Sequence, residues 1–123
     1  MNTPSPKLAH IVFEGNSRTA LGKFPFGARR KLGYALFQLQ LGEDPADSKP
    51  MKSIGQGVFE LRAQDPRGWY RVVYLKKIKD RIFVLHSFEK QSRKTSRHDI
   101  NLAQQRLTDV LARLKVEKNV TEI

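Results

Sequence analysis

Cysteine is absent from the 123 residues of this chain, which excludes a disulfide scaffold, thiol catalysis and every cysteine-based zinc or iron–sulfur site. The three histidines, His10, His86 and His98, are too scattered to form a metal-binding pair. No run of about 18 apolar residues could cross a bilayer, and the first residues lack the apolar segment of a signal peptide. We therefore expect a soluble, cytoplasmic protein that uses no metal and no cofactor.

Acidic residues are also scarce, with 12 Asp and Glu against 23 Lys and Arg, so the net charge is +11. A concentrated positive field attracts phosphates. Nucleic acid is therefore the first expected partner and an acidic protein the second. The length and a hydrophobic fraction of 39% predict one small globular domain over residues 1–123, in which residues 1–8 form a loose tail.

Two stretches have helical periodicity. In the first, from Thr19 to Leu41, apolar residues recur at Leu32, Ala35, Leu36 and Leu39. Pro25 splits this stretch into a short turn and a longer helix, and Gly42 ends it. The second begins near His98 or Asp99, and its apolar face consists of Ile100, Ala103, Leu107, Val110, Leu111 and Leu114.

Strand patterns precede and separate these helices. A short strand is expected at His10–Glu14, and three more at 58–63, 69–76 and 81–88, joined by turns at 65–68 and 79–80. Short connections make these three an antiparallel meander, whereas residues 43–57 have loop composition. This order predicts an α+β fold with a small antiparallel sheet. Helices cover one face of the sheet and leave the other to solvent or a ligand.

The positive charge is concentrated on the meander and the loop after it. Residues 62–97 hold eleven basic and three acidic residues, which is +8 of the total +11. Arg62 and Arg71 are the most informative, because neighbouring strands can bring two such side chains within reach of one phosphate. The structural alternative, without a functional role, is that Arg62 pairs with Glu60 or Asp65. The loop contributes a second basic group, composed of Lys90, Arg93, Lys94 and Arg97.

Other polar and aromatic side chains could have either a structural or a functional role. His86 shares a strand face with Ile82, Val84 and Phe88 in this assignment, which favours a hydrogen-bonded core residue over a functional one. His98 either caps the last helix or is simply exposed. Trp69, Tyr70 and Tyr74 of the second meander strand could stack on bases, but alternation with Val72 predicts that Tyr70 and Tyr74 face the core.

The sequence contains no nucleophile motif, no phosphate-binding glycine loop and no cluster of carboxylates, which argues against a metal-dependent nuclease. Basic groups can nevertheless cleave RNA without metal. One group deprotonates the 2′-hydroxyl, cations stabilise the charge on the phosphorane, and an acid protonates the leaving 5′-oxygen.

Several segments together resemble the phage-derived, HigB-like branch of the RelE/ParE toxin superfamily. They occur in the family's order and spacing between about Ile11 and Leu111, and they are Leu39-Gln-Leu-Gly-Glu-Asp-Pro45, Lys49 to Arg62, Gly68-Trp-Tyr-Arg-Val-Val-Tyr74, Val84-Leu-His-Ser-Phe88 and Lys90-Gln-Ser-Arg-Lys-Thr95. The resemblance implies a RelE-like fold and the toxin role in a type II toxin–antitoxin pair. It also implies a helix-turn-helix antitoxin as partner and, in many relatives, ribosome-dependent cleavage of mRNA.

By this resemblance the strand arginines Arg62 and Arg71, and the basic residues Lys90 and Lys94, bind or activate RNA. Several ribonuclease members have a tyrosine just before the last helix, whereas here Ser96-Arg97-His98 occupies that stretch. His98 and Lys90 are the available proton carriers, and we expect Arg67, Arg93 and Arg97 to bind RNA. Two rival functions stay open: a ParE-like toxin that inhibits DNA gyrase without cleaving anything, and a phage-derived regulator that binds RNA or protein.

Overall fold

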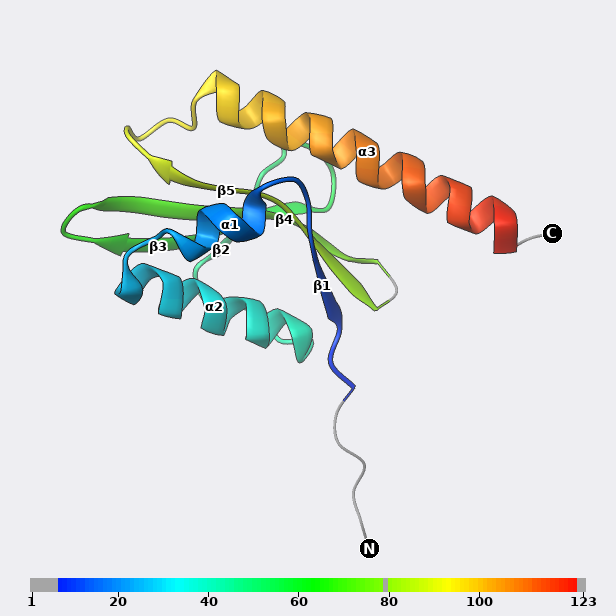
Figure 1. The fold of residues 1–123 in the computed structure, drawn as a ribbon, viewed down its shortest axis with the longest axis horizontal. Helices are drawn as coiled ribbons and strands as arrows, with labels where there is room; N and C mark the ends of the chain where they lie inside the picture. Colours follow the sequence, from blue (N-terminus) through cyan, green and yellow to red (C-terminus); the bar gives the residue numbers. More distant parts are fainter. Residues whose placement is uncertain (1–6, 79, 122–123) are drawn as a thin grey trace, which may run out of the picture.

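The computed structural model describes residues 7–78 and 80–121, which form a five-stranded sheet with a helical layer on each side (Figure 1). The strand order is β1-β5-β4-β3-β2. Residues 1–6 of the expected tail and Lys79 of the expected second turn lie outside the described residues. Within the described chain, no helix combines the length and the apolarity that a membrane span requires.

The antiparallel meander is confirmed. It consists of β3 (Val58–Asp65), β4 (Gly68–Ile78) and β5 (Arg81–Lys90), each longer than its sequence pattern indicated. The turn between β3 and β4 is held by Asp65, whose carboxylate oxygen accepts hydrogen bonds from the backbone N–H groups of Arg67 and Gly68. Asp is favoured in such turns for this reason.

Two edge strands complete the sheet. β2 (Ser48–Pro50) pairs antiparallel with β3 and lies inside the stretch that loop composition assigned to residues 43–57. β1 (His10–Phe13) pairs with β5 in parallel, so the sheet is mixed and only its meander and β2 are antiparallel. Two parallel neighbours require a long connection between them. Here the connection from β1 to β5 comprises two helices and the strands β2, β3 and β4.

The first two helices cover one face of the sheet. They are α1 (Ser17–Gly22) and α2 (Phe26–Gln40), separated at Pro25 as expected, and Gly42 ends the second with a φ of 83°. The apolar stripe of α2 packs into a cluster with alternate residues of the strands, including Tyr70 and Tyr74, which do face the core.

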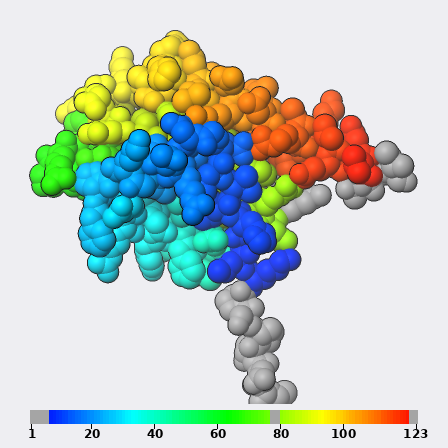
Figure 2. Space-filling view, in the orientation of Figure 1, coloured from blue at the N-terminus to red at the C-terminus, as the bar shows by residue number. Residues whose placement is uncertain are grey.

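The third helix, α3 (Arg97–Thr121), covers the opposite face, so the prediction that helices occupy one face only is wrong. The physical reason lies in β4 and β5, whose residues are apolar on both faces. Val73, Leu75, Phe83 and Leu85 form a second buried cluster with Ala103, Leu107 and Val110 of α3. A sheet with two apolar faces needs a layer on each. The C-terminal turns of α3 extend past the sheet (Figure 2).

A register irregularity in β5 changes the position of His86. Val73 pairs with His86 but its neighbour Tyr74 pairs with Val84, which leaves Leu85 as an extra residue. Such a bulge inverts the alternation of faces beyond it. His86 therefore lies on the α3 side of the sheet, away from Ile82 and Val84, which corrects the face assigned from simple alternation.

Candidate nucleic-acid interface

Three cationic side chains from three adjacent strands converge on the α3 side of the sheet. Arg62 of β3 pairs in register with Arg71 of β4, and Lys90 of β5 pairs with Trp69, two residues before Arg71. In a sheet, such neighbours on one face are close enough for their side chains to meet. The sequence prediction that the two strand arginines come together is therefore confirmed in its geometry.

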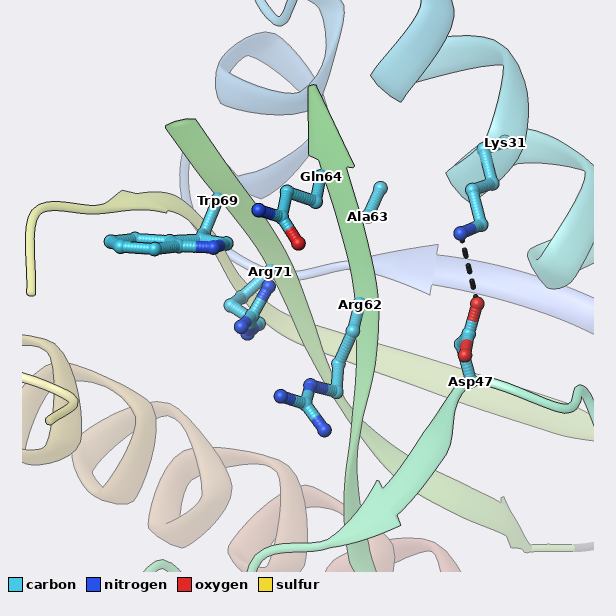
Figure 3. A pocket seen from close by; sticks show the side chains of 7 residues that line it. All are labelled: Lys31, Asp47, Arg62, Ala63, Gln64, Trp69 and Arg71. Carbon is cyan, nitrogen blue, oxygen red and sulfur yellow. Dashed lines mark ion pairs between the residues drawn. The ribbon is translucent and has the colours of Figure 1, made fainter. Parts of the chain in front are cut away.

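These side chains line two adjoining hollows that share Arg62, Trp69 and Arg71. One hollow, of about 330 Å³, is completed by Lys90, Ser92 and Arg93. The other, of about 290 Å³, reaches the edge of β3 and is completed by Lys31, Asp47, Ala63 and Gln64 (Figure 3). We call the two hollows together the cationic groove. Lys31 and Asp47 are themselves an ion pair at 2.9 Å, so the unneutralised charge lies at the arginine end.

A buried carboxylate contacts the two arginines of the cationic groove. Glu60, which is 3% exposed, has one oxygen 3.1 Å from the Nε of Arg71 and 3.8 Å from the Nε of Arg62. Its second oxygen is buried and accepts no hydrogen bond from any described residue. Arg71 is 4% exposed and also donates from Nη1 to the carbonyl oxygen of Tyr70. Glu60 thus neutralises part of the cluster from beneath, while the side chain of Arg62 is 47% exposed.

The groove changes the proton affinity of Lys90. Burial lowers the pKa of its ammonium group below the usual 10.5, and the positive charges of Arg71, Arg62 and Lys49 lower it further against the opposing effect of Glu60. Like charges disfavour another proton, as does a desolvated site. Lys49 belongs to this group because it pairs in register with Glu60 from β2. Lys90 therefore loses its proton at a lower pH than a lysine side chain in water does.

The other basic residues expected in the site are more dispersed. Arg93 joins the groove, but Lys94, Arg67, Arg97 and His98 are exposed and line neither hollow. Arg67 lies in the turn between β3 and β4, while the others lie in the loop and first turn of α3. They flank the groove and do not form its walls.

The start of α3 is fixed to the sheet beside the groove. The Nε2 of His86 lies 2.7 Å from Asp99, whose second carboxylate oxygen accepts a hydrogen bond from Ser96. The Ser96 hydroxyl in turn accepts the backbone N–H of Asp99, so Ser96 caps the helix and His98 does not. His86 is buried and stacks on Phe88, which confirms the reading of a hydrogen-bonded core histidine.

Comparison with known proteins places the chain in a family. Residues 19–108 match the family described as "Phage derived protein Gp49-like (DUF891)", which is more than half of the chain. The chain belongs to the Gp49-like family. No curated protein sequence matches this Gp49-like chain.

Solved structures similar to the Gp49-like chain have the RelE fold. The E. coli toxin RelE, as a mutant in the free state, aligns with a TM-score of 0.54 and 15% identity over 70% of this chain and 87% of RelE. The RelBE2 toxin–antitoxin complex from Mycobacterium tuberculosis aligns with a TM-score of 0.50 and 19% identity, over 73% of this chain and all of the matched one. The predicted RelE-like α+β fold is confirmed.

Sequence reasoning missed two residues beside the groove of the Gp49-like chain: Glu60 as a partner of Arg71, and Lys49 as a neighbour of Lys90. Trp69, which was expected only as one of three aromatic residues that could stack on bases, lines both hollows. Glu60 was considered only as a partner that might silence Arg62, because its proximity to Arg71 depends on a diagonal contact across the sheet. Lys49 lies in a strand that was taken for loop. The available signal was the strand face that Glu60 shares with Arg62, two residues along β3.

The groove of the Gp49-like chain has the chemistry of a phosphate site. The half-exposed guanidinium of Arg62 can donate parallel hydrogen bonds to phosphate oxygens. Arg71, which is held in place by Glu60 and the carbonyl oxygen of Tyr70, adds its positive charge beside Arg62. Over residues 7–78 and 80–121, no three His, Asp or Glu side chains form a potential metal-binding group.

Proposed function

We propose that this Gp49-like protein is the toxin of a type II toxin–antitoxin system, of the HigB-like branch, and that it inhibits translation by cleaving mRNA on the ribosome. The observation that carries the proposal is the convergence of Arg62, Arg71 and Lys90 from three adjacent strands over a buried carboxylate. The RelE-like fold and the net charge of +11 support it.

The proposed reaction is an attack of the 2′-hydroxyl oxygen on the adjacent phosphorus. Lys90 in its neutral form takes the hydroxyl proton, and the bond between phosphorus and the 5′-oxygen breaks to leave a 2′,3′-cyclic phosphate. Arg62 and Arg71 bind the phosphate and stabilise the charge that grows on it. A protonated group, for which His98 at the start of α3 is the candidate, donates to the leaving 5′-oxygen. The 2′-hydroxyl restricts the substrate to RNA.

The ribosome would supply what so small a groove lacks. The ribosome holds mRNA in a defined path. Fixing the reacting groups relative to one another can lower the activation barrier substantially. The flanking cations Arg67, Lys94 and Arg97 are all exposed and suit contacts with RNA phosphates on either side of the groove.

The proposed regulatory partner is an antitoxin with a helix-turn-helix domain. One of the similar structures is a toxin–antitoxin complex, which supports a protein partner for this fold. The outer face of α2 offers surface of the right kind, because Phe26, Tyr34 and Phe37 are 67%, 63% and 43% exposed. Aromatic residues and arginine are enriched at protein interfaces, and no acidic residue occurs between Glu14 and Glu43. An acidic antitoxin segment would fit this face.

Brief expression in a bacterial host, followed by transcriptome-wide mapping of mRNA 5′ ends, tests the proposal. The wild-type protein should arrest growth and create new ends within translated frames. Arg71→Ala should abolish both, and Arg62→Ala repeats the test at a half-exposed side chain whose loss should leave the fold intact. Arg30→Ala, on the exposed side of α2, is the matched control and should behave as wild type. Growth arrest without new ends would reject cleavage and point to a protein target such as gyrase.

A further inference from the structure

The only tryptophan of the chain lies in the cationic groove. Trp69 stands near the start of β4, and its partners across the sheet are Gln64 on β3 and Lys90 on β5. Both partners are polar, and Trp69 belongs to neither apolar cluster of the described residues. Burial of apolar surface in the core therefore does not account for an indole at this position.

Trp69 lines both hollows of the groove, next to the two arginines that we assign to the phosphate. In Figure 3 the indole and the guanidinium groups of Arg62 and Arg71 lie on the same side of β3, away from the ion pair of Lys31 and Asp47. The ring thus lines the same hollows as the arginines that we assign to the phosphate of a bound strand.

We propose that Trp69 is a stacking platform for an RNA base next to the scissile phosphate, and that Gln64 contacts the edge of that base. The inference rests on the proposed function and adds a specificity element to the same groove. Every base has an aromatic face, so stacking on indole binds single strands with little regard to sequence. Unstacked bases in single-stranded RNA are the parts that proteins read.

Gln64 provides the selective component. It faces Trp69 across the β3–β4 pair, is exposed, and lines the same hollow. A carboxamide can donate and accept hydrogen bonds at once, as the edge of a base does. Substitution of Gln64 should therefore change which base is preferred next to the cleaved bond, whereas substitution of Trp69 should weaken binding to all bases alike.

Binding of two oligonucleotides to the purified protein tests the stacking role. One is a short 2′-O-methyl oligoribonucleotide, which cannot be cleaved through the 2′-oxygen. The other has the same backbone and charge but an abasic residue at each position. The wild type should bind the first about tenfold more tightly, with a change in Trp69 fluorescence that the abasic strand does not produce.

Four variants separate stacking from charge. Trp69→Leu should lose the preference for the strand with bases, and Trp69→Phe should retain most of it. Val116→Ala, which removes an exposed apolar side chain of α3 that lines neither hollow, should change neither affinity. Arg62→Ala should weaken both strands equally, because both carry the same phosphates.

The outcomes distinguish this inference from the function on which it rests. Equal binding of the two strands by the wild type, or an unchanged preference in Trp69→Leu, overturns the stacking role and leaves the phosphate site standing. If neither strand binds, both the phosphate site and the stacking role are overturned. A preference that disappears in Trp69→Leu and survives in Trp69→Phe supports the platform, even where cleavage on ribosomes is not observed.

Discussion

Arg71 and Glu60 form a buried ion pair, with the Nε of Arg71 3.1 Å from a carboxylate oxygen of Glu60 and both side chains at most 5% exposed. Arg62 shares the same oxygen from the groove side, at 3.8 Å. Arg71 and Glu60 are therefore shielded from solvent, whereas the side chain of Arg62 is about half exposed in the groove. Burial lowers the pKa of Arg71 while Glu60 raises it, and the guanidinium stays charged.

Truncating one partner of this pair should destabilise the protein strongly. We expect Glu60→Ala to lower the free energy of unfolding by about 3 kcal/mol, because Arg71 is left as a buried charge without its partner. Arg71→Ala should act similarly, and the double variant should lose less than the sum of the two. Urea denaturation of the four proteins measures this coupling. Arg62→Ala, at an exposed side chain, should cost less than about 1 kcal/mol, and strict additivity would contradict the pairing.

The lowered pKa of Lys90 predicts a pH dependence of RNA cleavage. If neutral Lys90 takes the 2′-hydroxyl proton, the single-turnover rate rises with pH until its pKa, which lies below 10.5, is reached. Lys49→Ala removes one positive neighbour and should move this rising limb to higher pH. Lys90→Arg keeps the charge but cannot lose a proton, so it should bind RNA and not cleave it.

Lys94→Arg is the matched control for that experiment, since Lys94 lies in the loop just after the β5 residue Lys90 but lines neither hollow. It should retain both binding and cleavage. Full activity of Lys90→Arg would remove Lys90 from the role of base and leave it as a phosphate contact.

Acidification should destabilise the fold through His86. Burial lowers the pKa of His86 below 6.5, and Arg106 and His98 act in the same direction, although its hydrogen bond to Asp99 opposes them. Below 6.5 the unfolded chain thus binds more protons at this residue than the folded one, and the free energy of unfolding falls as the pH falls. Urea midpoints measured between neutral and mildly acidic pH report this slope.

His86→Gln keeps a polar partner for Asp99 and removes the titration, so its slope should be flatter than that of the wild type. His98→Gln, at an exposed position, should keep most of the slope. An identical slope in His86→Gln would assign the effect to another group.

Two glycines should respond to alanine in opposite ways. Gly33 lies within α2 with open space around a Cβ, so Gly33→Ala should stabilise the protein by about 0.5–1 kcal/mol. A Cβ at Gly55 would collide with the side chain of Leu107, a core residue of α3. Gly55→Ala should destabilise it by about 1–3 kcal/mol. Thermal melts of both variants check the signs, and two changes in the same direction would contradict this packing.

The elements that the sequence predicts well are those with a clear local period. The apolar spacing of α2, the alternation of β3 and the break at Pro25 all depend on near neighbours in the chain. The parallel pairing of β1 and the second helical layer depend instead on contacts between distant segments, which local patterns do not encode. β2 is three residues long and contains Pro50, so it has too short a pattern to detect.

The same distinction applies to the groove. Arg62 and Arg71 could be predicted because a charge inside a strand is conspicuous against apolar neighbours. Glu60 beneath them depends on the register of β3 against β4, and the face of His86 depends on a bulge with no marker in the sequence. Composition alone does not distinguish the basic residues of the loop before α3 from one another. Only the fold shows that Arg93 lines the groove and Lys94 does not.

The parallel pairing of β1 with β5 also determines when the groove can form during synthesis of the chain. His10 is made well before its partner Arg81 and the groove residue Lys90. Sheets that join such distant segments have high contact order and fold slowly. We therefore expect the emerging chain to lack the assembled groove until β5 has been completed.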